Sequence, residues 1–279
     1  MFDLPQLEES LAGTIFSGKF HFAAVTDSTN TDALAAARAG APHGSVYFAD
    51  EQLAGRGRGN HAWHSAAGQG LYVSVLLRPA IPAVRLPLLP LAAGLAAAEA
   101  IRATTGIHVD LRWPNDLLIG PSKTGGILVE AGAGSKSLPQ AVVSSRYAVV
   151  SLPYAVVGIG INVHQSSFAA GLATPATSLD LEAERHAVAP VSRQTLLVAL
   201  LKSLEDEALR LADPAAVQTI PRRMQAASTW VSGRSVQVHG PQACKGVTAG
   251  LDANGFLLVD TDAGRVTVQT GGLRARTQA

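Results

Sequence analysis

The spacing of hydrophobic positions along the chain predicts alternating strands and helices. Helical spacing of alanine and leucine predicts helices after Asn30 up to Gly40, and at about 86–104, 192–211 and 214–226. Short apolar runs predict strands at 19–25, 45–51, 70–77, 108–113, after Gly125-Gly126, and at 154–163. This alternation predicts an α/β body.

From Thr229 the pattern changes to short alternating strands separated by turn signals. The turn markers are Ser232-Gly233, Asn254-Gly255 and Ala263-Gly264. About fifty residues of this kind predict a small β-barrel appended to the body. We therefore expect two domains, at 1–227 and 228–279.

Composition narrows the class of protein. Of the 279 residues, 47% are hydrophobic and 15% are charged, so the chain can bury a sizeable core and is not disordered over most of its length. There are 22 Lys and Arg against 21 Asp and Glu, a net charge of +1. This balance gives no electrostatic case for DNA or an anionic membrane as the main partner.

Location follows from three absences in the sequence. Cys244 is the only cysteine, so neither an intrachain disulfide nor a cysteine metal cluster can form. The N-terminus lacks a signal-peptide pattern, and proline and Glu99 interrupt the most apolar window, 86–101. We expect a cytoplasmic protein without a membrane partner.

The segment 51–63, E-Q-L-A-G-R-G-R-G-N-H-A-W, is the strongest candidate for function. Three glycines alternate with Arg56 and Arg58 in a loop between two predicted strands. Glycine lets a backbone approach a ligand closely, and arginine carries donors suited to carboxylate or phosphate oxygens. Taken alone, the loop could equally be a polar connector or a nucleic-acid contact. Since no acidic partner for either arginine is evident nearby, we expect the loop to be mobile until ligand binds.

Other polar groups each have an ordinary structural explanation. Ser28-Thr29-Asn30 precedes an alanine-rich helix, and capping of that helix would be enough to explain it. Asn115 and Asp116 follow Pro114, and a turn at this point would be enough to explain them. Lys123 at the start of a strand could simply be solvated. Asn162 follows Gly158 and Gly160, whose alternation on a strand indicates close approach by a ligand or another backbone.

Taken in order, these motifs are far more specific. Asp27-Ser28-Thr29-Asn30, Gln52-x-x-Gly55-Arg56-Gly57-Arg58-x-x-x-x-Trp63, Trp113-Pro114-Asn115-Asp116, Lys123-x-x-Gly126-Ile127-Leu128-x-Glu130 and Gly158-x-Gly160-x-Asn162 follow one another. The set closely resembles biotin protein ligase, strongly from about Val25 through Val163 and weakly beyond.

The resemblance implies a mixed α/β catalytic domain with a C-terminal SH3-like β-barrel. It also implies activation of biotin by ATP, accompanied by Mg²⁺, to biotinyl-5′-adenylate, and transfer to the biotin carboxyl carrier protein of acetyl-CoA carboxylase. We expect a monomer or weak homodimer and no dedicated metal site.

Site residues transfer position by position from the resemblance. Biotin-binding residues would be Ser28, Thr29, Asn30, Gln52, Arg56, Gly57, Arg58 and Lys123. Nucleotide-binding residues would be Trp63, Asn115, Asp116, Gly126 and Asn162. Lys123, Arg58 and Asp116 would be catalytic, because cations can offset the repulsion between the biotin carboxylate and the α-phosphate.

Three features depart from the family pattern. Arg112 stands where lysine usually precedes Trp-Pro-Asn, which keeps the charge but changes the geometry. The stretch between Glu130 and Gly158 is unusually long and contains a near-repeat of Tyr-Ala-Val-Val, and we expect 131–152 to be a peripheral arm. Only about two dozen residues precede Asp27, so we expect no helix-turn-helix domain and no repressor role.

Two other functions remain open. The chain could be a lipoate or octanoate ligase or transferase of the same fold, although the Gly-Arg-Gly-Arg loop and the Trp-Pro-Asn-Asp turn argue against this. It could also be a non-catalytic biotin-sensing module, which the retention of Lys123 beside both loop arginines disfavours.

Overall fold

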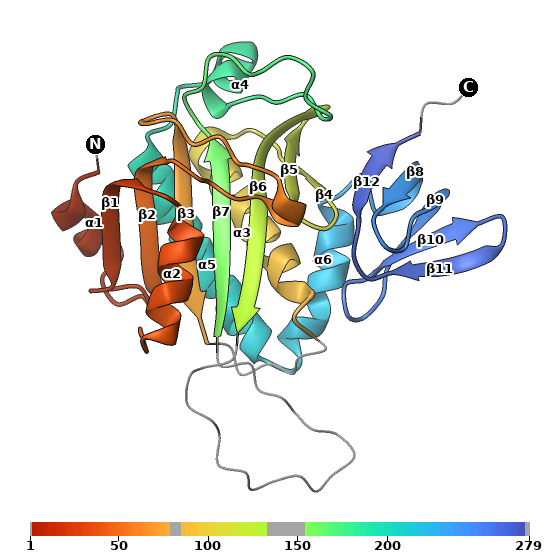
Figure 1. Ribbon diagram of the computed structural model, residues 1–279, viewed down its shortest axis with the longest axis horizontal. Helices are drawn as coiled ribbons and strands as arrows, with labels where there is room; N and C mark the ends of the chain where they lie inside the picture. Colours follow the sequence, from red (N-terminus) through yellow and green to blue (C-terminus); the bar gives the residue numbers. More distant parts are fainter. Residues whose placement is uncertain (1, 79–84, 133–153, 277–279) are drawn as a thin grey trace, which may run out of the picture.

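The computed structural model describes residues 2–78, 85–132 and 154–276, which form a large α/β body and a smaller β-domain (Figure 1). The body is built on a seven-stranded sheet in the order β1-β2-β3-β7-β6-β5-β4. Strands β1 and β2 are parallel, and every other neighbouring pair is antiparallel. Its strands are β1 (Phe20–Thr26), β2 (Ser45–Gln52), β3 (Gly70–Leu77), β4 (Asp110–Arg112), β5 (Asp116–Ile119), β6 (Ser122–Gly132) and β7 (Tyr154–Asn162).

Helices cover both faces of this sheet (Figure 1). Helices α3 (Leu88–Thr105) and α5 (Arg193–Ala212) pack behind it, while α2 (Thr29–Arg38) lies on the front. The remaining helices are α1 (Leu4–Ser10), α4 (Leu179–His186) and α6 (Ile220–Ala226), with short 3₁₀ turns η1 (Arg58–Asn60) and η3 (Ala216–Thr219). Because helices lie on both sides, the central strands can be apolar on both faces.

Strand β3 shows how the two faces differ. Every residue of its sequence G-L-Y-V-S-V-L-L is buried. Leu71, Val73, Val75 and Leu77 belong to the main core, whereas Leu76 joins a second cluster with Ala33 and Ala37 of α2. Since side chains alternate along a strand, Ser74 faces the α2 side. The polar cleft described below lies on that side.

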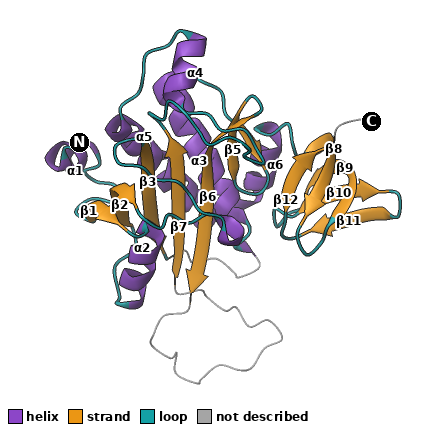
Figure 2. Cartoon of the chain, turned by 45° about the horizontal axis from the view of Figure 1, so that its top comes forward, coloured by secondary structure: helices purple, strands orange, loops and turns teal. Residues whose placement is uncertain are grey.

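The C-terminal β-domain, residues 232–275, is a five-stranded antiparallel sheet in the order β11-β10-β9-β8-β12 (Figure 2). Its strands are β8 (Ser232–His239), β9 (Cys244–Leu251), β10 (Leu257–Thr261), β11 (Gly264–Val268) and β12 (Gly272–Ala275). The predicted fold class, an α/β body with a small SH3-like C-terminal domain, is confirmed. The domain boundary at 227/228 stays a prediction.

The β-domain is held against the β4–β5 end of the body. Trp113 Nε1 donates a hydrogen bond of 3.0 Å to the carbonyl of Gly255, in the turn before β10. A Cβ atom at Gly255 would lie 2.7 Å from Leu91 and 2.9 Å from Leu88 of α3. This turn therefore needs glycine for close approach as well as for its φ of +81°.

Several predicted elements differ from those observed. The predicted strand at 108–113 is only three residues long, and Asp116 begins β5 instead of lying in the turn. Helices α1 and α4 and strand β12 were not predicted. The first Tyr-Ala-Val-Val copy and the rest of 133–153 lie outside the described residues. Among helices in the described ranges, none combines the length and hydropathy needed to span a bilayer.

Candidate functional site

A cleft of about 460 Å³, open mouth included, lies on the α2 side of the central strands. Eleven predicted site residues line it: Ser28, Thr29, Asn30, Gln52, Arg56, Gly57, Arg58, Trp63, Asn115, Lys123 and Gly126. The structure thus brings together residues that are nearly a hundred positions apart in the sequence.

One end of the cleft is polar and uncharged. Thr29, Asn30 and Ser74 are all at most 5% exposed. Thr29 Oγ1 lies 2.8 Å from Ser74 Oγ, which in turn donates to Asn30 Oδ1 at 2.6 Å. Gln52 Oε1 accepts from the Thr29 backbone N–H at 2.9 Å. Hydroxyl and amide groups at this end can read a neutral ligand that carries both donors and acceptors.

Ser28 occupies the N-cap position of α2 but makes no side-chain capping bond. Its backbone has the extended conformation that N-cap residues adopt, with φ −163° and ψ 128°. The residue is 2% exposed and lines the cleft. Capping alone therefore does not account for this serine, and its hydroxyl is available to a ligand.

The glycine-arginine segment folds back on itself as a hairpin-like loop. Trp63 N–H donates to the Gly55 carbonyl at 2.8 Å, and Gly57 N–H donates to the His61 carbonyl at 2.7 Å. A Cβ atom at Gly55 would lie 2.4 Å from the Trp63 carbonyl oxygen, so only glycine permits this crossing. Gly59 has a φ of +67°.

Both loop arginines lack a partner in the neighbouring sequence, as expected, but each has partners far away in the sequence. Arg56 makes a bidentate ion pair with Glu130, at 2.6 and 3.1 Å. Arg58 donates to Thr270 Oγ1 at 2.5 Å and to the Gly271 carbonyl, both in the C-terminal β-domain. The mobility of the loop itself stays a prediction.

Trp63 packs against the middle of the sheet, where β7 carries glycines. A Cβ atom at Gly160 would lie 2.5 Å from Trp63 Nε1, and one at Gly158 would lie 2.1 Å from Asn30 Oδ1. The sequence predicts approach by a ligand or another backbone, whereas the groups that lie closest to these glycines are two side chains of the site. Buried Trp63 Nε1 has no hydrogen-bond partner within the described residues.

The other end of the cleft is cationic and is organised by Asp116. Lys123 Nζ lies 2.5 Å from Asp116 Oδ1, and Arg112 Nη2 lies 2.7 Å from Asp116 Oδ2. Burial alone would raise the pKa of Asp116, but the charges of Lys123 and Arg112 outweigh it and hold the pKa below its usual range. Asp116 is therefore a carboxylate that orients two cations.

Lys123 lies between Asp116 and the ring of Trp63 and contacts both. Its Nζ lies 5.5 Å from the centroid of the Trp63 ring, within reach of a cation–π interaction. The backbone of Lys123 is bonded on both sides to the segment 175–177, because its N–H donates to Pro175 and its carbonyl accepts from Thr177. The stem of Lys123 thus leaves β6 from a fixed position.

Two predicted residues, Asp116 and Asn162, do not line the cleft. Asp116 acts through Lys123 and Arg112, as described. Asn162 Nδ2 donates to the Thr177 carbonyl at 3.0 Å, and its Oδ1 accepts from Gln165 at 3.4 Å. Asn115, which does line the cleft, donates a hydrogen bond from its Nδ2 to the Ile127 carbonyl. The nucleotide roles of these residues stay predictions.

Sequence reasoning did not assign several residues that form or support the cleft. Ser74 and Tyr72 are hidden in an otherwise apolar strand, and nothing in their local sequence signals a site. Glu130 and the glycines of β7 stand in the quoted motifs, but only the folded chain shows what they contact. The missed lining residues are Tyr72, Val73, Ser74, Ile127, Leu128, Gly158, Ile159 and Gly160.

Chemically, the cleft suits a ligand with a neutral polar head and an anionic end. Arg56, Arg58 and Lys123 all line it, and none of its lining residues is acidic. Within the described residues, no group of three His, Cys, Asp or Glu side chains could hold a metal ion.

Comparison with known proteins gives a consistent picture. The model of the biotin/lipoate A/B protein ligase family matches residues 22–144. The biotin–[acetyl-CoA-carboxylase] ligase of Mycobacterium tuberculosis is 32% identical over 257 residues, covering 89% of this chain and 85% of the relative. The bifunctional ligase/repressor BirA of Bacillus spizizenii is 41% identical over 143 residues, which are 51% of this chain but only 40% of that protein.

Among solved structures, a biotin protein ligase from Aquifex aeolicus in complex with biotin and ATP has the same fold. It matches with a TM-score of 0.74 and 26% identity, covering 94% of this chain and 100% of the other. The similarity therefore includes the C-terminal β-domain as well as the α/β body.

Proposed function

This chain belongs to the biotin/lipoate A/B protein ligase family, and on that premise we propose that it is a biotin protein ligase. In the first step an oxygen of the biotin carboxylate attacks the α-phosphorus of ATP. The bond to the β-phosphate breaks, pyrophosphate leaves, and biotinyl-5′-AMP remains. In the second step the amine of a carrier lysine attacks the biotinyl carbonyl, and AMP leaves.

The observation that carries this proposal is the polarity of the cleft. Its neutral end presents Ser28, Thr29, Asn30 and Gln52, with Arg56 held beside Asn30 by Glu130. Its charged end presents Arg58 and Lys123. Biotin has the matching polarity, because its ureido ring is neutral with one acceptor and two donors, while its tail ends in a carboxylate. The Aquifex neighbour was solved with both biotin and ATP.

Each charged group has a part in the first step. The biotin carboxylate and the triphosphate repel each other, and Arg56, Arg58, Lys123 and the Gly57 backbone are placed to offset that repulsion. Asp116 orients Lys123 without itself touching the ligand. We assign the nucleotide to the side of the cleft formed by Trp63, Gly126 and Asn115, with Asn162 supporting the loop beneath it.

Mg²⁺ enters as part of the MgATP substrate. Mg²⁺ usually keeps several waters and binds through substrate phosphates and one or two carboxylates. The described residues hold no cluster that would cage it, and the one carboxylate near the cationic end, Asp116, is already bound by two cations.

The proposed acceptor is the biotin carboxyl carrier protein of acetyl-CoA carboxylase, as the name of the Mycobacterium relative suggests. We further propose a cytoplasmic enzyme, supported by its use of ATP and by a lone cysteine, and a monomer or weak homodimer that does not bind DNA. A near-neutral net charge of +1 is consistent with the absence of DNA binding.

The proposal is tested by incubating the protein with biotin, ATP and Mg²⁺. We expect biotin-dependent pyrophosphate release, biotinyl-5′-AMP detected by mass, and a mass gain on a purified carrier domain. Lipoate and octanoate in the same assay address the alternative within the fold. Adenylation of lipoate in preference to biotin would overturn the assignment, and biotin binding without pyrophosphate release would indicate a sensing module.

A further inference from the structure

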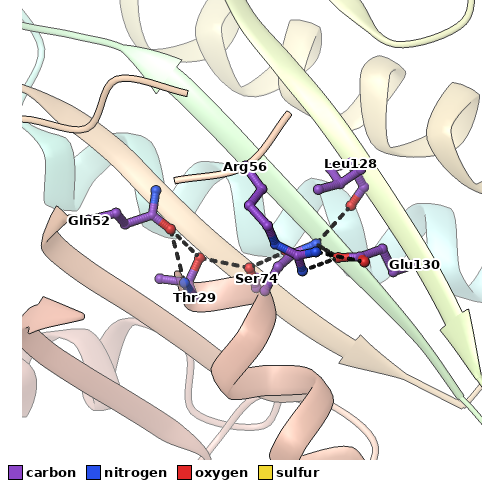
Figure 3. A network of polar contacts seen from close by, with 7 residues as sticks. Thr29, Gln52, Arg56, Ser74, Leu128 and Glu130 are labelled. Carbon is purple, nitrogen blue, oxygen red and sulfur yellow. Dashed lines mark hydrogen bonds and ion pairs between the residues drawn. The ribbon is translucent and has the colours of Figure 1, made fainter. Parts of the chain in front are cut away.

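A chain of hydrogen bonds connects the neutral end of the cleft with the glycine-arginine loop (Figure 3). It runs from Gln52, which accepts from the Thr29 backbone, through Thr29, Ser74 and Asn30 to Glu130, and ends on Arg56. Its members come from β2, α2, β3 and β6 and from the loop. Glu130 is the one carboxylate in this series of hydrogen bonds, yet it does not line the cleft.

Glu130 binds two groups at once. Its Oε2 accepts from Asn30 Nδ2 at 2.9 Å and from Arg56 Nη2 at 2.6 Å, while Oε1 accepts from Arg56 Nη1 at 3.1 Å. Its side chain is 28% exposed and that of Arg56 is 41% exposed. A charged bidentate pair has a more definite geometry than a single neutral hydrogen bond.

Together with the Leu128 carbonyl, which accepts from Asn30 Nδ2 at 3.5 Å, the carboxylate also fixes the direction of the hydrogen bonds behind it. An ionised carboxylate can only accept, so the amide of Asn30 must turn its Nδ2 toward Glu130 and its Oδ1 toward Ser74. Ser74 then donates its single proton to Asn30 Oδ1, at 2.6 Å. Consequently Ser74 must accept from Thr29, whose hydroxyl lies 2.8 Å away.

Thr29 is thereby left as an acceptor toward the cleft. Its one proton points to Ser74, so the longer 3.2 Å contact with Gln52 Oε1 does not receive it. A lone pair of Thr29 Oγ1 remains for a ligand N–H. This is the polarity that a ureido N–H donor requires.

We propose that Glu130 is a positioning residue for biotin activation, which holds Arg56 in the loop and sets the hydrogen-bond polarity of the pocket that reads the ureido ring. This role rests on the proposed function of the cleft. It assigns one carboxylate to two tasks, namely the orientation of the pocket and the placement of the loop.

The test uses Glu130→Gln in the full chain. Glutamine preserves the length of the side chain but loses the charge, and its NH₂ group can face Asn30 Oδ1, which reverses the chain of donors. We expect biotin to bind about tenfold more weakly, as loss of a hydrogen bond to a charged group typically causes. The rate of adenylate formation at saturating biotin should fall by less than the affinity does, because Lys123 and Arg58 keep their own partners and Glu130 does not touch the reacting atoms.

The loop gives a second measurement that needs no ligand. Amide hydrogen exchange at 55–60 in ligand-free protein should be several-fold faster in Glu130→Gln than in the parent. Combining Glu130→Gln with Arg56→Gln should weaken biotin binding by much less than the product of the two single effects. Glu130→Asp, which keeps the charge, should recover part of the affinity.

A matched control removes a comparable ion pair elsewhere. Asp260→Asn disrupts the bidentate Arg265–Asp260 pair at 2.7 and 3.0 Å on the C-terminal β-domain, and it should change neither measurement. Biotin affinity of Glu130→Gln within twofold of the parent would overturn the role, even if exchange in the loop increased. A parent that binds no biotin would instead refute the proposed function, and this role with it.

Discussion

Asp116 places one negative charge between Lys123 and Arg112 at the cationic end of the cleft. Its side chain is only 16% exposed, against 10% for Arg112 and 27% for Lys123. The carboxylate thus fixes the position of the Lys123 ammonium group through one of its three N–H donors, and the other donors can face a ligand. An arginine in place of the family's usual lysine at position 112 also reaches Thr174 Oγ1, at 3.0 Å.

Lys123→Met should slow adenylate formation much more than it weakens biotin binding. A lysine is a point charge on a flexible stem and can follow charge as it moves from the carboxylate to the bridging oxygen. Loss of one such electrostatic contact typically costs about 10²–10³ in rate. Single-turnover rates and a biotin dissociation constant measure the two effects. Lys202→Met on the exposed side of α5 is the control. Equal losses in rate and affinity would make Lys123 a binding residue.

Asp116→Asn should destabilise the fold in a pH-dependent manner. Removing one partner of a buried ion pair typically costs about 3–5 kcal/mol. Since the folded-state pKa of Asp116 is lowered, its stabilising contribution is complete above the unfolded pKa, near 3.8, and is lost as the pH falls through the folded value.

Urea unfolding of the parent and of Asp116→Asn from pH 7 to pH 3 measures this contribution. The difference in free energy of unfolding should be constant above about pH 5 and should shrink below it. Other carboxyl groups titrate alike in both proteins, so their contributions cancel in the difference between the two free energies of unfolding. A difference that stayed constant down to pH 3 would contradict a charge-based role for Asp116.

At the scale of elements, strands β6 and β7 form the base of the cleft because their glycines leave room for side chains from elsewhere. Gly126 pairs with Gly160 across the two strands. Trp63 then lies over both positions, 3.6 Å from the Cβ that Gly126 would carry and 2.5 Å from that of Gly160. The strands supply a flat surface, and the preceding loop supplies the aromatic ring.

Gly160→Ala should displace Trp63 and weaken ATP-dependent steps more than biotin binding. Overpacking a filled site typically costs about 1–3 kcal/mol, which corresponds to a loss of roughly 5- to 150-fold. The apparent KM for ATP and the biotin dissociation constant separate the two effects. Gly272→Ala, where an added Cβ meets nothing within 4 Å, is the control. An unchanged KM for ATP would remove Trp63 from the nucleotide site.

Sequence reasoning succeeded where the chemistry lies within a short segment. The periodicity predicted β3 and β7 and the long helices α3 and α5. Eleven of the residues that the motifs singled out line one cleft. Sequence reasoning failed where a residue's role depends on a distant partner. Arg56 and Glu130 are 74 positions apart, and Arg58 and Thr270 are 212 apart, so nothing near either arginine indicates its partner. Ser74 is one polar residue in a buried strand.

At the scale of the whole molecule, the C-terminal β-domain touches two segments of the site. Its Gly255 carbonyl accepts a hydrogen bond from Trp113, in the turn before Asp116. Its Thr270-Gly271 segment accepts hydrogen bonds from Arg58 of the loop. Arg112, which holds Asp116, also lies 5.1 Å from the Trp230 ring, in the connection to β8. The β-domain is thus in contact with both the turn that precedes Asp116 and the glycine-arginine loop.

These contacts imply that the β-domain restrains the glycine-arginine loop before ligand binds. Thr270→Val removes the hydroxyl that accepts from Arg58 and leaves the Gly271 carbonyl, so the restraint should weaken without being lost. We expect amide exchange at 55–60 to be about two- to tenfold faster in ligand-free Thr270→Val, because a surface hydrogen bond to a charged group contributes on the order of 1 kcal/mol. With biotinyl-5′-AMP bound, we expect Arg58 to take the phosphate as its partner, and the difference should disappear. Thr267→Val, on the neighbouring strand β11, is the control. Equal exchange in the ligand-free parent and Thr270→Val would mean that the β-domain touches the loop without restraining it.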